Sequence, residues 1–325
     1  MLKHISPYSN VPDFINGITR EIWEDRGIGS KLAKYYASDI KLRAPTGYTG
    51  TNHGVTAQTL QTLHQFPDRQ LIGEDVIWQP YADGSFLSSH RLVSVMTHTG
   101  NGVYGVAAGR PVRSRIIADC WVRDGVVVEE WLVRDQAAFA HCLGTSAREM
   151  AREMADSELH ADQAISFFTP AKDQPSQCPF AIDNDPAVAR YVQGLHDIWN
   201  SKNTAAIRDV YFHGANLHTP GGDTRYGHAD IDRFIIGYLA AMPDAKLQVH
   251  SAFINREAEQ PLRIAARWSL SGSHSGWGQF GQPSGAPLYI MGLSHAQVTQ
   301  SRVVNEWIMF DEVSIWKQIY AHQAR

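Results

Sequence analysis

The spacing of hydrophobic residues follows a helical period in the first part of each half of the chain. Residues 14–25 and 188–200 carry apolar side chains three or four positions apart, which is typical of an amphipathic helix. A short helix is predicted to end near residues 35–36 in the first half and 210–212 in the second. A loop rich in Gly, Pro and Thr follows, and then a third helix over residues 55–66 and 229–242. Each third helix is predicted to stop at a Pro-Asp pair, because proline cannot continue a helix.

Beyond the Pro-Asp pair the hydrophobic pattern alternates with a period of two. Residues 73–79, 85–98 and 113–133 are rich in β-branched and aromatic side chains and are predicted strands. Asp124-Gly125 predicts a tight hairpin, because glycine accepts the positive φ that the turn needs. Gln300-Ser301 stands at that place in the second half and predicts a looser turn. Helices followed by an antiparallel sheet indicate an α+β fold.

The two halves of the chain repeat one another. VVVEEWLVRD (residues 126–135) returns as RVVNEWIMFD (residues 302–311), and the same shift of 176 positions aligns Trp23 with Trp199 and Arg91 with Arg267. A period this long exceeds the roughly 20–50 residues of a solenoid repeat and indicates a duplicated globular domain. The sequence therefore predicts one domain over residues 1–150 and a second over 186–325. Residues 151–185 are expected to form a helical tail and a linker.

Composition limits the kinds of partner that the protein can have. The chain of 325 residues has a formal charge of −4, which gives no reason to expect binding to nucleic acid or to an anionic membrane. No apolar run reaches the roughly 18 residues of a membrane helix, and the start of the chain lacks the apolar core of a signal peptide. Three widely spaced cysteines predict a reducing, cytoplasmic location without a zinc cluster.

The repeated segments resemble SnoaL-like polyketide cyclases, which belong to the nuclear-transport-factor-2-like superfamily. The resemblance rests on THTGNGVYGVAAGRPV (residues 97–112), on GSHSGWGQFGQPSGAPL (residues 272–288) and on the closing hairpin RDGVVVEEWLVRDQAAFAHCLG. It implies two tandem cone-shaped domains, each with N-terminal helices packed in a curved antiparallel sheet. It also implies a cavity for an apolar, polycyclic substrate and an internal pseudo-dimer of the two halves, with a homodimer as a further possibility.

The same resemblance implies a cofactor-independent reaction. In the family a buried aspartate acts as general acid and base in an intramolecular aldol ring closure, without a metal. Asp119 lies in the matching strand and is the predicted catalytic residue, although it could instead face solvent or pair with Arg91 or Arg115. His295 takes the equivalent place in the second half and could also transfer protons near neutral pH.

Two further histidines occupy one repeated motif position. His98 and His274 could polarise a substrate carbonyl or relay a proton, or each could bond a loop at the end of a strand. His90 and His98 lie eight residues apart and so share a strand face, but without a third ligand at readable spacing we predict no metal site.

Several large side chains are candidates for substrate binding, each with a structural alternative. The arginines could instead pair with acids, and the first-helix tryptophans could lie in the core. In each closing strand Glu and Trp alternate, so one of them is expected to line the cavity and the other to form an interface. Asp135 and Asp311 are predicted helix N-caps. The candidates for substrate binding are Trp23, Trp131, His90, Arg91, Trp199, Arg267 and Trp307.

Three functions fit these features. The first is a cyclase-like acid–base enzyme that acts on an apolar carbonyl compound. The second is a non-catalytic protein in which one or both cones bind a small hydrophobic molecule. In the third, one half is mainly structural and supports the other.

Overall fold

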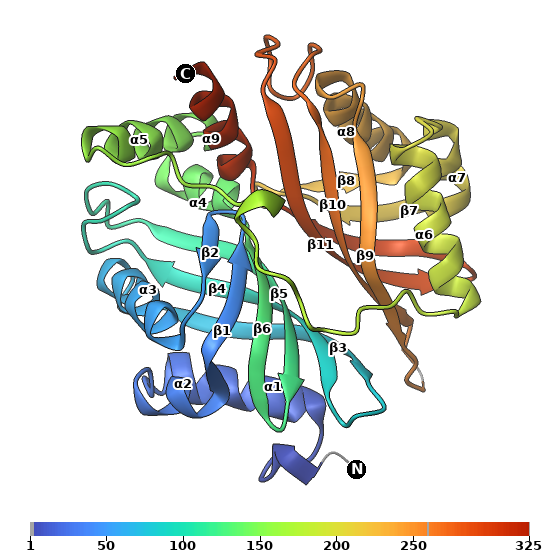
Figure 1. Cartoon of the computed structure of the whole chain (residues 1–325). Helices are drawn as coiled ribbons and strands as arrows, with labels where there is room; N and C mark the ends of the chain where they lie inside the picture. The colour runs from blue at the N-terminus through green and yellow to red at the C-terminus, as the bar shows by residue number, and fades with distance from the viewer. Residues whose placement is uncertain (1–2, 259, 325) are drawn as a thin grey trace.

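The chain forms two domains of the same architecture, each with a six-stranded sheet wrapped around helices (Figure 1). The computed structural model describes residues 3–258 and 260–324. The first domain contains α1 (Val11–Thr19), a π-helical turn (Arg20–Glu24), α2 (Ser30–Tyr35), β1 (Tyr36–Ala44), β2 (Gly47–Thr49), α3 (Asn52–Gln65), β3 (Gln70–Pro80), β4 (Phe86–Thr97), β5 (Pro111–Arg123), β6 (Val126–Arg134), α4 (Gln136–Leu143) and α5 (Ala147–His160). The second contains α6 (Pro186–Trp199), α7 (Ile207–Val210), β7 (Tyr211–His218), β8 (Thr224–Tyr226), α8 (Gly227–Ala241), β9 (Lys246–Asn255), β10 (Leu262–Ser273), β11 (Pro287–Thr299), β12 (Arg302–Met309) and α9 (Glu312–Gln323).

The two sheets have the same strand order, β2-β1-β6-β5-β4-β3 and β8-β7-β12-β11-β10-β9. They are mixed rather than purely antiparallel, because β1 pairs with β6 and β7 pairs with β12 in parallel. The expectation of an antiparallel sheet was therefore incomplete. Residues 36–49 and 211–226, in which we predicted a helix end and a loop, form short edge hairpins. In β1 the apolar residues Tyr36, Ile40, Leu42 and Ala44 do alternate, but the strand that pairs with them, β6, comes about ninety residues later in the chain.

The local signals in the sequence produce the predicted boundaries. Asp135 and Asp311 cap α4 and α9, accepting hydrogen bonds from the backbone of Ala138 and Val313. Asp124 and Gly125 both adopt positive φ in the β5–β6 hairpin. The prediction of a looser turn in the second half was wrong. Gln300 and Ser301 also adopt positive φ, at 50° and 62°, because the paired strands on either side leave room for only two residues.

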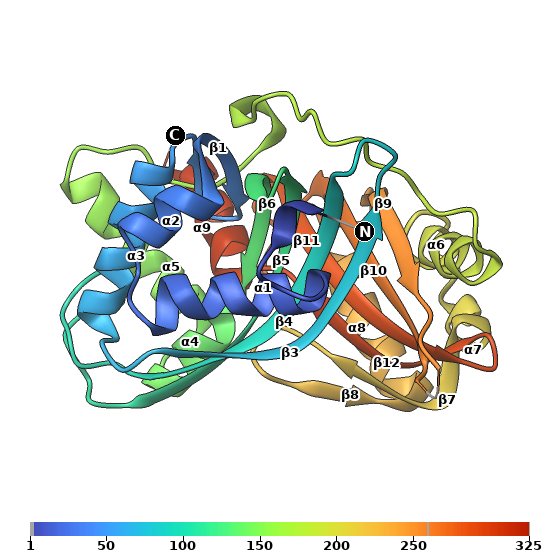
Figure 2. The same cartoon turned by 90° about the horizontal axis from the view of Figure 1, so that it is seen from below.

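The convex faces of the two sheets pack against each other in the middle of the molecule (Figures 1 and 2). Helices α1–α3 and α6–α8 lie on the outer, concave sides. Strand residues therefore alternate between a cone interior and the sheet–sheet interface. In β5, Ile117 and Trp121 belong to the interface cluster, whereas Ile116, Ala118 and Cys120 belong to the interior of the first cone.

The segment between the domains is held against the first sheet. Arg43, which is fully buried, forms ion pairs with Glu129 at 2.8 Å and with Asp173 at 2.5 Å, and its guanidinium also donates to the carbonyl oxygen of Gln174. None of the helices in the described residues is both long and apolar enough to cross a membrane.

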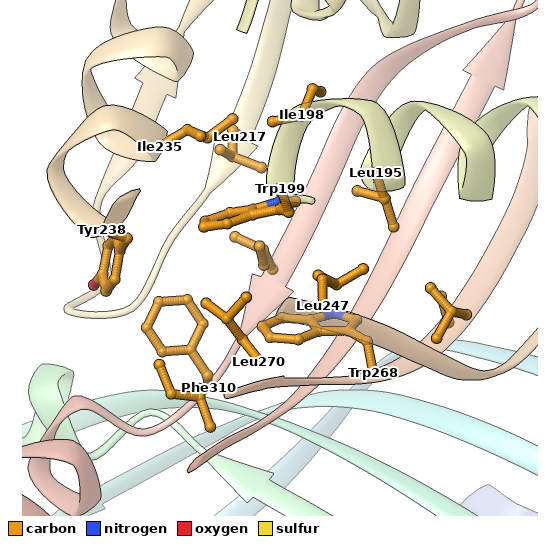
Figure 3. Packing of buried hydrophobic residues seen from close by; sticks show 14 of the residues in the cluster. Leu195, Ile198, Trp199, Leu217, Ile235, Tyr238, Leu247, Trp268, Leu270 and Phe310 are labelled. Atoms are coloured by element: carbon orange, nitrogen blue, oxygen red, sulfur yellow. The ribbon is translucent and has the colours of Figure 1, made fainter. Parts of the chain in front are cut away.

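The interior of the second cone is a packed hydrophobic core (Figure 3). Trp199, Trp268 and Phe310 meet there, with Tyr238 beside Phe310 at a ring separation of 5.3 Å. Gly292 lies opposite Trp268 in the strand register, and a Cβ atom at Gly292 would come within 2.1 Å of the indole. The large Trp268 side chain thus depends on a glycine across from it.

Candidate active site

The first cone encloses a cavity of about 110 Å³ between its helices and the concave face of its sheet. Apolar side chains from α1 and α3 form one wall, and alternate residues of β4, β5 and β6 form the other. The polar residues that line this cavity are Thr19, Tyr36, Gln58, Thr59, Thr62, Arg69, His90, Glu130 and Arg134. A cavity of this size resembles the roughly 150 Å³ cavity that accommodates a benzene ring in another protein.

Glu130 on β6 is the only carboxylic acid among the cavity-lining residues that the structure describes. It is buried, and burial raises its pKa to about 7, while the charge of Arg134 and a hydrogen bond from Tyr36 act in the opposite direction. Near neutral pH this carboxyl group exchanges readily between its acid and its carboxylate. A group with such a pKa suits proton transfer in either direction.

Glu306 occupies the equivalent place in the second domain, but hydrogen bonds within the domain hold its carboxylate. Its two carboxylate oxygens accept hydrogen bonds from the hydroxyl groups of Tyr191 at 2.6 Å and Tyr211 at 2.5 Å. The position that corresponds to Tyr191 in the first domain is Ile15, which lines the cavity. The fold therefore satisfies one glutamate internally and directs the other toward an open space.

His90 faces the same cavity from β4. Burial, and to a lesser extent the charge of Arg91, lower its pKa to about 4, so the imidazole is neutral at pH 7. Its Nε2 atom has no hydrogen-bond partner in the described part of the chain. Strands β4 and β6 are separated by one strand, which places the backbones of His90 and Glu130 roughly 10 Å or more apart. A small ligand could contact both side chains.

The mouth of the cavity opens into a second hollow of about 350 Å³, which shares Gln58, Thr62, Leu132 and Arg134 with it. The second domain supplies part of this outer wall through Asp311 and Lys317. The ammonium group of Lys317 bonds Glu158 at 2.9 Å, so that the C-terminal helix is fastened to α5 at the mouth.

Comparison with known proteins identifies the fold of the second half. Residues 189–319 match the family model described as SnoaL-like polyketide cyclase. The second domain is a SnoaL-like domain. The first domain has the same strand order and strand register, so its architecture repeats that of the second domain. No curated protein sequence matches the chain.

Several solved structures described as putative polyketide cyclases are similar to part of the chain. A putative SnoaL-like polyketide cyclase from Jannaschia sp. CCS1 is 13% identical, with 43% of this chain and 97% of its own chain covered and a TM-score of 0.36. IdmH, a putative polyketide cyclase from Streptomyces antibioticus, is 22% identical, with 41% and 97% covered and a TM-score of 0.34. A putative polyketide cyclase from Acidithiobacillus ferrooxidans is 16% identical, with 45% and 100% covered and a TM-score of 0.38.

Asp119, the predicted catalytic residue, does not face the cavity of the first SnoaL-like domain. In β5 the residues that line the cavity are Ile116, Ala118 and Cys120, so Asp119 points to the opposite face of the sheet. It is buried there, and burial raises its pKa to about 6 against a hydrogen bond from Ser89 and the charge of Arg267. Asp119 thus lies at the interface between the sheets rather than in the cavity, because neighbouring residues of a strand point to opposite faces.

His295 joins Asp119 in a hydrogen-bonded chain between the two sheets. Its Nδ1 atom lies 3.2 Å from Nη1 of Arg91, and its Nε2 atom lies 2.8 Å from the Ser89 hydroxyl. Because a guanidinium can only donate, Nδ1 accepts and Nε2 carries the proton. The Ser89 hydroxyl is then free to donate to Asp119. These polar groups connect the domains and do not line the cavity.

The remaining interface candidates stack on one another across the sheets. The Arg91 guanidinium lies 3.6 Å from the ring centroid of Trp307 and forms an ion pair with Glu74. The Arg267 guanidinium lies 4.4 Å from the centroid of Trp131. These four side chains therefore hold the two SnoaL-like domains together. The expectation that Glu and Trp of the closing strand face opposite ways is confirmed in the first domain, because Glu130 lines the cavity and Trp131 the interface.

His98 and His274 lie at strand ends outside the cavity. His98 is fully buried and stacks on Phe66 at a centroid distance of 5.1 Å. His274 hydrogen-bonds the hydroxyl of Ser284 at 2.9 Å, and its backbone carbonyl accepts from Gly285. The contact of His274 agrees with the loop-fixing alternative. Neither ring nitrogen of His98 has a hydrogen-bond partner in the described residues, so His98 packs on Phe66 without bonding a loop. Among the tryptophans of the first helices, Trp23 lines the cavity, whereas Trp199 lies in the packed core.

The cavity arginines and Tyr36 were missed by sequence reasoning. The signal that could have found them is the difference between the two copies at cavity positions. Arg69, His90 and Arg134 correspond to Ala245, Ala266 and Phe310, 176 positions later. As for metals, no group of three or more His, Cys, Asp or Glu side chains among the described residues could hold an ion.

Proposed function

We propose that the first SnoaL-like domain is a cofactor-independent acid–base catalyst that acts on an apolar carbonyl compound, with Glu130 as the proton-transfer residue. The observation that supports this most directly is the contrast between two equivalent glutamates. Glu306 is saturated by two tyrosine hydroxyls, whereas Glu130 faces a cavity with a pKa near neutrality. The second domain then serves as a structural partner.

The proposed reaction begins with proton removal next to a carbonyl group. The Glu130 carboxylate takes the proton, the C–H electron pair becomes a C=C bond, and the carbonyl π pair moves to oxygen. In a ring closure the enolate carbon then attacks a second carbonyl carbon, and the alkoxide takes the proton back from Glu130. His90, which is neutral, is placed to hydrogen-bond a substrate oxygen through its unpartnered Nε2 atom. No electrons are gained or lost overall.

The size of the cavity bears on the substrate. A volume of about 110 Å³ suits a single ring, so a larger polycyclic compound would extend through the mouth into the outer hollow. We therefore propose a substrate whose reacting carbonyl lies inside the cone, and whose remaining part reaches the mouth.

The test measures exchange of α-hydrogens for deuterium by NMR in a panel of aryl ketones and aryl keto acids. Proton transfer by a positioned side chain contributes roughly 10²–10⁴-fold. Glu130→Gln should therefore lose about that factor, while Glu306→Gln, the matched control, should keep the wild-type rate per folded molecule. A Glu130→Gln protein as active as wild type would contradict the assignment.

Non-catalytic binding is the second candidate function. It is favoured by the cavity-facing positions of β5, where Ala118 and Cys120 stand and no acid is present. Tight binding of aryl ketones with no exchange in any of them would support this function instead.

A further inference from the structure

The cavity of the first domain holds two guanidinium groups that have no acidic partner of their own. Arg69, in the turn before β3, is 8% exposed, and its Nε atom has no hydrogen-bond partner. Arg134, at the end of β6, lines both the cavity and its mouth. Neither forms an ion pair with a carboxylate in residues 3–258 and 260–324.

The charges around these arginines do not balance. Glu130 is the one acid of the cavity wall in the described residues, and His90 is neutral at pH 7. At the mouth Glu158 is already paired with Lys317, and burial raises the pKa of Asp311 to about 7. The pKa of Arg69 is lowered to about 10 by burial and by Arg134, which still leaves it protonated at neutral pH. The cavity is therefore net positive.

The duplicated domain shows that the fold does not need these charges. At the equivalent positions Ala245 and Phe310 are buried in the hydrophobic core of the second domain. Burying an unpaired charge is unfavourable, so the buried Arg69, which shares one small cavity with the half-buried Arg134, calls for an explanation outside folding. A ligand that neutralises them supplies one.

We propose that Arg69 and Arg134 bind a carboxylate of the substrate, so that the first domain acts on an aryl or alicyclic keto acid. A guanidinium presents paired N–H donors whose spacing matches a carboxylate. The location of the site rests on the proposed function, but the carboxylate preference does not depend on the chemistry of Glu130.

Strand geometry allows one substrate to meet both ends of the site. Glu130 and Arg134 lie four residues apart on β6 and thus on the same face, with Cα atoms roughly 13 Å apart. The arginine side chain, when it extends back along the strand, reduces this separation to about the length of a ring with a short chain. The keto group then lies near Glu130 and the carboxylate at the mouth.

Calorimetric titration with 3-benzoylpropanoate and its neutral methyl ester tests the proposal on the full chain. The acid is expected to bind about 10-fold or more tightly than the ester, as one good charge-assisted contact predicts. Arg134→Met and Arg69→Met should each abolish most of this preference, because they should weaken binding of the acid much more than binding of the ester. Arg113→Met, a control at an exposed position of β5, should keep the preference.

Three outcomes would overturn the proposal: equal affinity for acid and ester, a preference that survives in both variants, or inorganic phosphate binding as tightly as the acid. Arg134→Phe, which copies Phe310 of the second domain, serves as a second variant should Arg134→Met fail to fold. Glu130→Gln should retain the acid preference. Loss of deuterium exchange in Glu130→Gln tests the proposed function separately. The carboxylate site and the catalytic role of Glu130 can therefore fail independently.

Discussion

Glu130 and Glu306 differ in their surroundings rather than in their chemistry. Glu306 has a tyrosine hydroxyl on each oxygen, whereas the replacement of Tyr191 by Ile15 removes one of these donors from the first domain. The residue at this position of α1 thus contributes to whether the glutamate is saturated by hydrogen bonds or available to a ligand. The repeated Glu-Trp motif alone cannot distinguish these two states.

The raised pKa of Glu130 makes a prediction about stability. From pH 4.5 to about 7 the unfolded chain ionises this carboxyl while the folded protein keeps it protonated. Its contribution to the free energy of unfolding is therefore present at acidic pH and is lost as pH rises through about 7. Glu130→Gln does not titrate, so relative to wild type it should gain up to about 3 kcal/mol between pH 4 and pH 8.

Thermal unfolding of both proteins at pH 4 and pH 8 checks this prediction. The informative quantity is the change with pH of the difference between variant and wild type, because the other titrating groups cancel in it. A difference that is the same at both pH values would mean that Glu130 ionises normally.

At the scale of elements, one strand pair decides whether a cone is open. Leu92 and Ile116 face each other across β4 and β5, and Trp268 and Gly292 take the same places across β10 and β11. The pair in the second domain fills the interior, because the glycine makes room for the indole. The pair in the first domain leaves the cavity open.

Transferring the filled pair should close the first cavity. The double variant Leu92→Trp/Ile116→Gly is expected to fold and to lose measurable binding of 3-benzoylpropanoate. Leu92→Trp alone should be destabilised by about 1–3 kcal/mol, because the indole then meets Ile116. Urea denaturation and calorimetry measure the two effects, and undiminished binding in a folded double variant would contradict the placement of the site.

At the scale of the whole molecule, the sheet–sheet interface contains buried polar groups as well as apolar ones. Arg91 is 4% exposed and contacts Glu74, His295 and Trp307 together. Arg115 shares the partner Glu74 but is more exposed, with 22% of its side chain accessible. The two arginines thus offer a matched comparison of a buried and a peripheral ion pair.

Arg91→Ala is expected to lower the free energy of unfolding by about 3 kcal/mol, since it breaks a buried ion pair and unstacks Trp307. Arg115→Ala should cost about 1 kcal/mol or less. Urea denaturation of the full chain compares the two variants, and equal costs would show that Arg91 does not hold the domains together.

The sequence by itself determined the duplication, the α+β class and most element boundaries. These follow from local physics: helical and alternating periods, the caps at Asp135 and Asp311, and the turn at Asp124-Gly125. The apolar neighbours of Asp119 also indicated a buried acid in β5. Strands β1 and β7 were not predicted, because their pairing depends on a strand about ninety residues away in the chain.

Only the tertiary structure decided which face of each strand lines the interior of a cone. Both faces of β5 carry apolar side chains, Ile116 and Ala118 on one and Ile117 and Trp121 on the other, because one packs under helices and the other against a second sheet. The alternation shows which residues share a face, but it does not show which of the two faces points into the cone. Asp119 was therefore assigned to the wrong face, and the cavity, with Glu130 and the two arginines, became visible only when both sheets and their helices were in place.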